Sequence, residues 1–311
     1  MRDKILKVLA IICSVLLGLI FLFSAIAKLY PIEPFEYTFV GLGIGGWQSS
    51  LFIARLFIGL ELACGVLLLL NLWLRKFTIP FVAFILIVFN IYLLLEIFMF
   101  GNKGNCGCFG EFLYLSPLEG ILKNIVLLMV CLFIYAYHNG LYFRWIKIVS
   151  GVLILASLVT PFILNPIDFD TSSQHYSGKL NYKLDLDILY NDAVNKPPKV
   201  ELRKGKWIVV FLSLTCPHCR IAAKKLHIMK NRNPNLPIHM VLNGKDKNLQ
   251  PFFDDTRADN ISYSKYAGAQ NFSKLAGTQF PAIFWVNNSM VENKTDYTVL
   301  QQEEIEAWLK N

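Results

Sequence analysis

Two pairs of cysteines stand at spacings that suit thiol chemistry. Cys106 and Cys108 are one residue apart in the stretch NCGCFG, and Cys216 and Cys219 are two residues apart in TCPHC. A cysteine thiolate is both a nucleophile and a metal ligand. The first pair could therefore be a metal clip, a strained disulfide or a coincidence, and the function depends on whether the two pairs can meet.

The second pair follows a short apolar run at Lys206–Leu214 and precedes a stretch with helical spacing, which predicts a strand, Cys-x-x-Cys and a helix. Unpaired amides and the positive end of the helix dipole stabilise a thiolate at Cys216, the expected attacking sulfur. Pro217 suits the first helical position. His218 adds a cation beside the thiolate, and Cys219, one turn on, can resolve a mixed disulfide.

Two structural readings of the second pair are weaker. A purely structural disulfide between Cys216 and Cys219 closes too short a loop to stabilise the fold much. A zinc site needs two further ligands, and His227 and His239 lack a suitable spacing. We therefore expect redox chemistry and no metal.

The segments that must position these pairs fall into two parts of the chain, with the boundary near Asn165-Pro166. The 311 residues are 55% hydrophobic, and this excess lies before the break, so part of the chain must be in a bilayer. Segments of about 20 apolar residues can cross the hydrocarbon as helices. Five are long enough: Val8–Ala27, Leu51–Leu72, Phe77–Phe100, Ser116–Tyr137 and Trp145–Leu164.

The charges of the connecting loops predict the orientation. Basic residues mark the cytoplasmic side of a membrane protein, and they gather before the first span, between spans two and three, and at the start of span five: Arg2, Lys4, Lys7, Arg75, Lys76, Arg144 and Lys147. The other loops, with Lys28 and Lys103, are poorer in basic residues. An odd number of spans then puts everything after residue 165 outside, in the periplasm of an inner-membrane protein.

Both cysteine pairs are therefore expected on the extracytoplasmic face, where disulfides form and persist. The first span resembles a signal peptide, but its apolar stretch is longer than a usual signal core, so we expect it to be retained. The net charge of +8 comes with no basic run. We read it as a topology signal and expect no nucleic-acid partner, only the lipid bilayer and protein thiols or disulfides outside the membrane.

Residues 198–311 resemble the thioredoxin fold, through the order of a strand, Cys-Pro-His-Cys at a helix start, a second strand and the later Phe280-Pro281. The resemblance implies that Pro281 is a cis-proline facing the cysteines, which suits the first residue of a strand. Two residues depart from thioredoxins. Thr215 stands where many have Trp, and Val210 where they carry a buried acid, which puts the kinetics and the direction of transfer in doubt.

Residues 8–137 resemble the DoxX family, in particular its methylamine-utilisation E-like (MauE-like) branch. The matching words are FLFSAIAKL, ARLFIGLELACGVLLLL and CGCFG. The resemblance implies a four-helix membrane domain linked to disulfide-dependent maturation of exported proteins, with an arrangement similar to vitamin K epoxide reductase-like thiol oxidases. Nothing in the chain indicates methylamine itself.

Charged residues within the spans predict a polar pocket below the NCGCFG loop. Arg55, Glu96 and Lys123 are expected at similar depth, with Glu61 deeper, and ionisable residues in a membrane usually face the bundle interior. Such a pocket could hold a quinone or could brace the bundle by ion pairs.

Three further cysteines, Cys13, Cys64 and Cys131, fall in the inner half of their helices and can be small core hydrophobes. Alternatively, Cys13 and Cys131 form a dithiol that carries electrons across the membrane.

The predicted organisation has four parts: a four-helix DoxX/MauE-like membrane domain (1–137), a fifth transmembrane helix (138–165), a linker with an added hairpin (166–197) and an α/β thioredoxin-like domain (198–311). The favoured function is a thiol-disulfide oxidoreductase that relays electrons between substrate thiols, Cys216/Cys219 and Cys106/Cys108. The alternatives are a reductase that imports electrons, and a thioredoxin-like maturation factor or chaperone with a non-catalytic membrane anchor.

Overall fold

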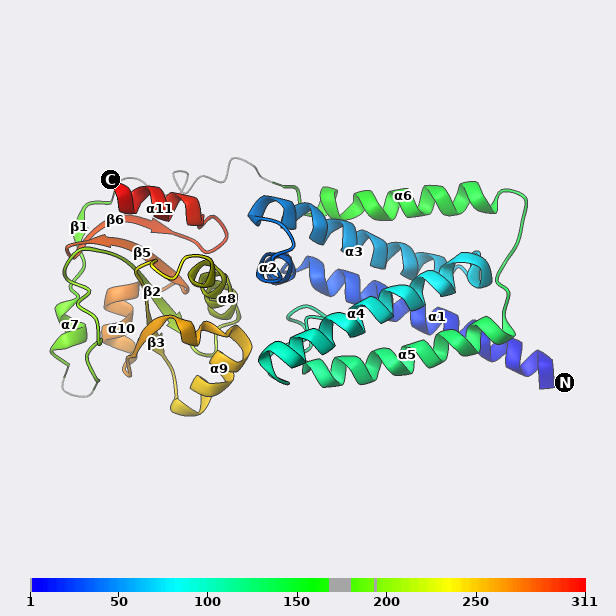
Figure 1. Ribbon diagram of the computed structural model, residues 1–311, viewed down its shortest axis with the longest axis horizontal. Helices are drawn as coiled ribbons and strands as arrows, with labels where there is room; N and C mark the ends of the chain where they lie inside the picture. Colours follow the sequence, from blue (N-terminus) through cyan, green and yellow to red (C-terminus); the bar gives the residue numbers. More distant parts are fainter. Residues whose placement is uncertain (1, 168–179, 193–194) are drawn as a thin grey trace. The chain divides into compact units, whose positions relative to one another are not determined.

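The protein is described here by a computed structural model that covers residues 2–167, 180–192 and 195–311. The chain forms two compact units, Met1–Ile167 and Asp168–Asn311, close to the predicted break. Figure 1 shows a helical unit and a unit built on a sheet. Each unit is described by itself.

The first unit contains five helical segments long and apolar enough to cross a membrane, as predicted. A short helix, α2, follows α1, and a π-helical turn, η1, runs directly into α4. The elements are α1 (Arg2–Leu29), α2 (Glu33–Gly41), α3 (Trp47–Leu69), η1 (Leu74–Thr78), α4 (Ile79–Phe100), α5 (Pro117–Tyr137) and α6 (Ile146–Leu164).

Four of these helices form a bundle and α6 lies outside it. Helix α1 packs against α3 and α5, α4 packs against α5, and α6 lies along α3 (Figure 1). A Cβ atom at Gly18 of α1 would come within 2.9 Å of the backbone of α3, so only glycine permits this close approach. Large apolar side chains such as Leu155 and Ile163 are exposed on α6. This arrangement is the predicted four-helix core with a fifth transmembrane helix.

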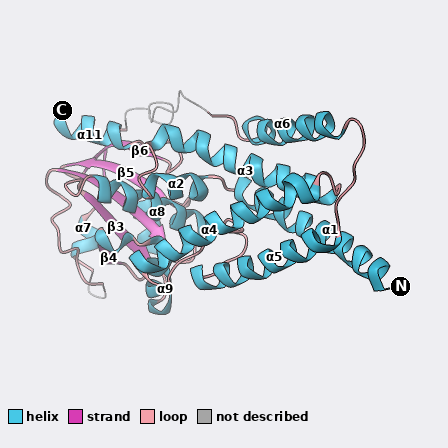
Figure 2. Ribbon diagram, turned by 45° about the vertical axis from the view of Figure 1, so that its right-hand side comes forward, coloured by secondary structure: helices cyan, strands magenta, loops and turns pink. Residues whose placement is uncertain are grey.

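The second unit is one six-stranded sheet with the strand order β1-β6-β5-β2-β3-β4 (Figure 2). Its strands are β1 (Tyr182–Lys183), β2 (Lys206–Ser213), β3 (Ile238–Asn243), β4 (Ser262–Lys265), β5 (Ala282–Asn287) and β6 (Met290–Thr295). Its helices are α7 (Asp187–Tyr190), α8 (Pro217–Arg232), α9 (Leu249–Thr256), α10 (Ala269–Ala276) and α11 (Gln302–Lys310), with 3₁₀ turns η3 (Asp246–Asn248) and η4 (Ala258–Asn260).

The core of this sheet has the thioredoxin-like topology. Strand β2 pairs parallel with β3 after the crossover through α8, and β5 pairs antiparallel with both β2 and β6 before α11 closes the chain. The run predicted as a buried strand is β2, whose side chains from Ile208 to Leu212 are fully buried. On one face Val209 and Phe211 pack with Phe272 of α10.

The prediction of a linker with an added hairpin at residues 166–197 differs from the structure in the part of this segment that the structure describes. Strand β1 pairs antiparallel with β6 instead of forming a local hairpin. Leu186 and Leu189 are buried in the same core cluster as Val209, so this segment belongs to the sheet unit. The sequence signal that could have predicted this placement is the apolar side chain that recurs every few residues in the segment. Residues 168–179 and 193–194 of the predicted linker lie outside the described residues.

Candidate active site

The end of β2 and the start of α8 position the soluble cysteine pair. The strand ends at Ser213, Cys216 is the N-cap of α8, and Pro217 takes the first helical position, where no amide donor is required. Cys216 is half-buried, whereas Cys219 is completely buried one turn later. The accessible sulfur therefore stands at the helix N-terminus, as predicted for the attacking group.

Cys219 lies in an environment that keeps its proton. The Ser213 amide donates to its Sγ over 3.3 Å, but burial outweighs this interaction and raises the pKa of the Cys219 thiol. A thiol with a raised pKa is a poor initial nucleophile. It can still act within a mixed disulfide at Cys216, where the reacting sulfurs are already adjacent.

The peptide bond between Phe280 and Pro281 is cis, as the thioredoxin resemblance implied. Cys216 Sγ lies 4.0 Å from the Phe280 carbonyl oxygen, so this bond lies beside the accessible sulfur of the pair. The loop that leads into β5 therefore forms one wall of the site.

His218 is exposed and its Nδ1 lies 3.0 Å from the hydroxyl of Tyr297. Tyr297 itself is buried, and its backbone carbonyl accepts from the Lys225 ammonium over 2.7 Å. Helix α8 is thus tied to the segment after β6 at two points. Sequence analysis did not single out Tyr297 or Lys225, because a tyrosine in a loop and a lysine on a helix carry no motif.

The membrane loop is held by its own hydrogen bonds. Asn105 Nδ2 donates to the Gly110 carbonyl over 2.9 Å, and the Cys106 amide donates to Leu115 O over 2.7 Å. Gly107 and Gly110 have positive φ angles of 69° and 55°. A Cβ at Gly110 would lie 2.3 Å from the Ala27 carbonyl oxygen, so the loop fits against the end of α1 only with glycine there.

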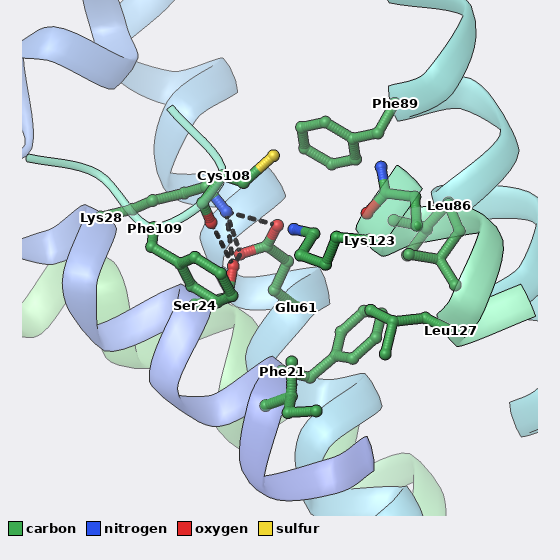
Figure 3. Close-up of a pocket in the computed structure, with 13 residues that line it drawn as sticks. Phe21, Ser24, Lys28, Glu61, Leu86, Phe89, Cys108, Phe109, Lys123 and Leu127 are labelled. Atoms are coloured by element: carbon green, nitrogen blue, oxygen red, sulfur yellow. Dashed lines mark hydrogen bonds and ion pairs between the residues drawn. The ribbon is translucent and has the colours of Figure 1, made fainter. Parts of the chain in front are cut away.

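A buried ion pair lies directly beneath this loop. Lys28 Nζ, from the last turn of α1, lies 2.8 Å from both carboxylate oxygens of Glu61 on α3, and 2.7 Å from Ser24 Oγ. Ser24 Oγ in turn donates to the Cys108 carbonyl over 2.8 Å. Figure 3 shows this chain of contacts, which links the loop to two helices.

Cys108 faces a small cavity in the bundle, with a volume of about 30 Å³. It is lined by residues of α1, α3, α4, α5 and the loop: Ile20, Phe21, Ser24, Lys28, Glu61, Ile85, Leu86, Phe89, Cys108, Phe109, Lys123, Asn124 and Leu127. The Lys123 ammonium lies 4.5 Å from the centre of the Phe109 ring. Two ammonium groups and one carboxylate therefore surround a cysteine.

The two loop cysteines differ in acidity. The hydrogen bond from Cys106, helped by the nearby ammonium groups of Lys123 and Lys28, lowers the pKa of Cys108 to about 6 despite burial. The same hydrogen bond and burial raise the pKa of Cys106. Cys108 is therefore the more acidic sulfur of the reduced pair.

Comparison with known proteins agrees with both halves of this architecture. The family model for methylamine utilisation protein MauE matches residues 6–137. Protein TlpB of Flavobacterium psychrophilum is 30% identical to the chain, covering 79% of this chain and 79% of that protein. The chain belongs to the TlpB family.

Two solved structures resemble the sheet unit at low similarity. A secreted Mycobacterium tuberculosis disulfide oxidoreductase homologous to E. coli DsbE is 15% identical, covering 35% of this chain and 83% of that one, with a TM-score of 0.30. The thioredoxin domain of a Bacteroides vulgatus thiol-disulfide oxidoreductase is 14% identical, covering 35% and 81%, with a TM-score of 0.29. The thioredoxin-like fold of this TlpB-family chain rests on its strand order.

The predicted pocket residues of this TlpB-family chain separate into two groups. Glu61 and Lys123 line the cavity, whereas Arg55 NH1 pairs with Glu36 of α2 at 2.7 Å and Glu96 is buried elsewhere on α4. Lys28, predicted to lie in an outward loop, is instead buried in α1. The sequence signal that could have found it is its place four residues after Ser24, on the same helix face.

The cavity fits the ion-pair alternative better than the quinone. Lysine ammonium groups and aromatic rings suit quinone carbonyl oxygens and a quinone ring. A water molecule needs about 10–15 Å³ of such volume, so a cavity of about 30 Å³ has room for about two waters and not for a quinone ring. We assign no step to a quinone, which stays a prediction.

The three inner cysteines share one apolar cluster. Cys64 and Cys131 are buried there with Leu17 and Phe21, and Cys13 packs against the cluster from a more exposed position. Their surroundings are those of core side chains. A transmembrane dithiol of Cys13 and Cys131 also stays a prediction.

Family membership, the MauE-type membrane domain and the Cys-x-x-Cys at the start of α8 together define the class of enzyme. This TlpB-family protein is a multi-pass membrane thiol-disulfide oxidoreductase.

Proposed function

We propose that the protein relays electrons between protein thiols outside the membrane, the Cys216/Cys219 pair and the Cys106/Cys108 pair, in support of disulfide formation or maturation of exported proteins. Each transfer is a thiol-disulfide exchange. A thiolate attacks a disulfide sulfur, a mixed disulfide forms, and a second thiolate releases it, so one dithiol is oxidised as one disulfide is reduced.

One observation within the membrane unit carries this proposal: the chain leaves the bundle at the end where the cysteine loop lies. At this exit, Asn165 Nδ2 donates to Leu29 O over 3.3 Å, next to the end of α1. The loop meets the same end of α1 through Ser24 and Ala27. The described residues of the sheet unit include no further span. Both cysteine pairs should therefore face the same compartment.

The opposite end of the bundle supports the proposed orientation. It holds the basic residues that mark the cytoplasmic side, at the start of α1, in η1 and before α6. Arg75 Nη1, for example, donates to Asn139 Oδ1 over 3.0 Å, and Arg75 Cζ lies 5.1 Å from the centre of the Tyr135 ring. The cysteine loop and the sheet unit would then face the periplasm of an inner-membrane protein.

The experiment that tests the relay is a trap in native membranes. The Cys219→Ser variant keeps the attacking sulfur but cannot release a mixed disulfide. After acid quenching and alkylation, non-reducing gels of an affinity-tagged chain carrying a cleavable site between the two units should show a covalent link between them. The link should vanish on reduction and in a variant that also carries Cys106→Ser and Cys108→Ser.

A matched control is Cys219→Ser combined with Cys64→Ser and Cys131→Ser, which leaves Cys216 and the Cys106/Cys108 pair intact. The link should persist there. If Cys219→Ser gives no link between the units under oxidising or reducing conditions, the relay is wrong and the membrane unit is an anchor.

A further inference from the structure

The charged side chains around Cys108 carry a net positive charge. The proposed relay does not by itself explain this charge. Glu61 is satisfied by Lys28, which lies 2.8 Å from both of its oxygens. Among the described residues, no ion pair joins Lys123 to a carboxylate. The cavity that holds Lys28, Glu61 and Lys123 thus carries one excess positive charge next to the Cys108 sulfur.

Cys108 is the group placed to balance that charge. Figure 3 shows the Cys108 side chain and the Lys123 ammonium in the same cavity, with Phe89 and Phe109 beside them. These rings reduce contact with water, which strengthens an interaction between an ammonium and a thiolate. Cys106 packs against α5, where a Cβ at Gly120 would be 3.2 Å from its Sγ. An anion is therefore stabilised more at Cys108, which both ammonium groups and a hydrogen bond favour, than at Cys106.

We propose, resting on the relay above, that Lys123 makes Cys108 the departing sulfur and Cys106 the attacked sulfur, so that the loop disulfide oxidises the Cys216/Cys219 pair. Lys123 acts as a positioning residue, since it holds the charge of the leaving thiolate. The relay then has a direction, from protein thiols outside the membrane toward the membrane unit.

The exchange balances in two steps. The Cys216 thiolate attacks Cys106 Sγ, the Cys106–Cys108 bond breaks, and its electron pair leaves on Cys108 as a thiolate beside Lys123. The Cys219 thiol then loses its proton to solvent and attacks Cys216. A Cys216–Cys219 disulfide forms, and Cys106 departs and takes up a proton. The soluble pair loses two electrons and the loop pair gains them.

The charged cavity around Cys108 favours this direction, because its two ammonium groups stabilise the thiolate of the reduced loop pair. A sulfur with a lower pKa is the better leaving group, and stabilising the reduced form of a pair makes that pair more oxidising. The pKa of Cys108 is lowered to about 6, whereas burial raises the pKa of Cys219 in the soluble pair. Ionisation of Cys108 therefore stabilises the reduced form of the loop pair at neutral pH. Cys219 keeps its proton and does not stabilise the reduced soluble pair in this way.

The first test identifies the sulfur that Cys216 attacks. The trapped Cys219→Ser protein is quenched in acid and treated with N-ethylmaleimide. It is then cut with trypsin, which leaves both loop cysteines within residues 104–123 and Cys216 within 207–220. Fragment-ion spectra should place the maleimide on Cys108 and the disulfide on Cys106. The reverse pattern overturns the proposal while leaving the relay intact. Absence of any linked peptide overturns both.

The second test measures how the charge of Lys123 affects the redox equilibrium of the loop pair. The equilibrium of the loop pair against glutathione is measured in full-length protein with Cys216→Ser and Cys219→Ser. Lys123→Met should make the loop disulfide about tenfold less oxidising at pH 7, because an opposite charge nearby lowers a pKa by about 1–3 units. Tenfold corresponds to about 30 mV for two electrons.

Lys123→Arg keeps the charge and should stay within about twofold of the parent. Lys103→Met removes an exposed lysine of the same loop, outside the cavity, and should also stay within twofold. An unchanged equilibrium in Lys123→Met, or an equal change in Lys103→Met, overturns the proposal. The peptide-mapping test keeps the native Lys123. It therefore tests which loop sulfur Cys216 attacks even if Lys123→Met does not fold.

Discussion

At the scale of single residues, the two sulfurs of each pair differ in their surroundings. In the soluble pair, Cys216 is half-buried at the N-cap of α8 and Cys219 is completely buried. In the membrane loop, Cys108 lies beside two ammonium groups, and Cys106 is packed against Gly120. In the soluble pair Cys216 is therefore the accessible sulfur, and in the loop pair Cys108 is the sulfur suited to leave as a thiolate.

The raised pKa of Cys219 predicts a pH dependence for release of a mixed disulfide at Cys216. Release requires the Cys219 thiolate, and the thiolate fraction below the pKa grows about tenfold per pH unit. The release rate should therefore rise with pH from 6 to 8, approaching tenfold per unit. Stopped-flow measurements on the chain loaded with a peptide at Cys216 check this.

The control for that measurement is an added small thiol of ordinary pKa, which bypasses Cys219 in the Cys219→Ser variant. Its release rate should level off near the pKa of the added thiol. A rate in the parent protein that does not change between pH 6 and 8 would contradict the role assigned to Cys219.

The sequence predicted the reactive residues more readily than their partners. The spacing of Cys216 and Cys219 and the position of Pro281 carry recognisable chemistry. Lys28, Ser24 and Tyr297 do not, because their roles depend on side chains more than 30 residues away, and only the fold brings these together.

At the scale of elements, the Lys28–Glu61 pair joins α1 to α3 and supports the cysteine loop. Both side chains are almost completely buried, and Ser24 extends the contact to the Cys108 carbonyl. Removing one partner of a buried ion pair leaves the other partner buried with an uncompensated charge. This contact therefore couples helix packing to the position of the loop.

Lys28→Met alone should reduce the stability of the bundle by about 3–5 kcal/mol, because Glu61 then stays buried without its partner. The double variant Lys28→Met and Glu61→Leu should recover most of that loss. Reversible unfolding of the purified protein in mixed micelles measures both. Equal destabilisation in the single and double variants would show that the ion pair has no such role.

Secondary structure was predictable where the apolar pattern was long. The five spans are recovered because a membrane helix needs about 20 apolar residues, whatever its neighbours. Strand β1 was missed because it has two residues and exists only through pairing with β6. The predicted hairpin in that region assumed a local partner, whereas the true partner lies over 100 residues away.

In the whole molecule, the proposed relay requires both cysteine pairs to face one compartment. In intact spheroplasts treated with a mild reductant, a membrane-impermeant maleimide should label Cys216 directly, because only the reduced thiol reacts. In a Lys76→Cys variant in which Cys106, Cys108, Cys216 and Cys219 are all replaced by serine, labelling should require permeabilisation, because η1 lies at the opposite end of the bundle. Labelling of Lys76→Cys in intact spheroplasts would reverse the proposed orientation.

In the proposed relay, the membrane loop sets the redox state of the soluble pair. The most direct measurement is the oxidised fraction of Cys216/Cys219 in growing cells, determined by acid quenching and a mass-shifting alkylating reagent. In the Cys106→Ser and Cys108→Ser double variant, the account predicts that this pair accumulates in the reduced form while the parent stays largely oxidised. An oxidised fraction equal to that of the parent would contradict the account.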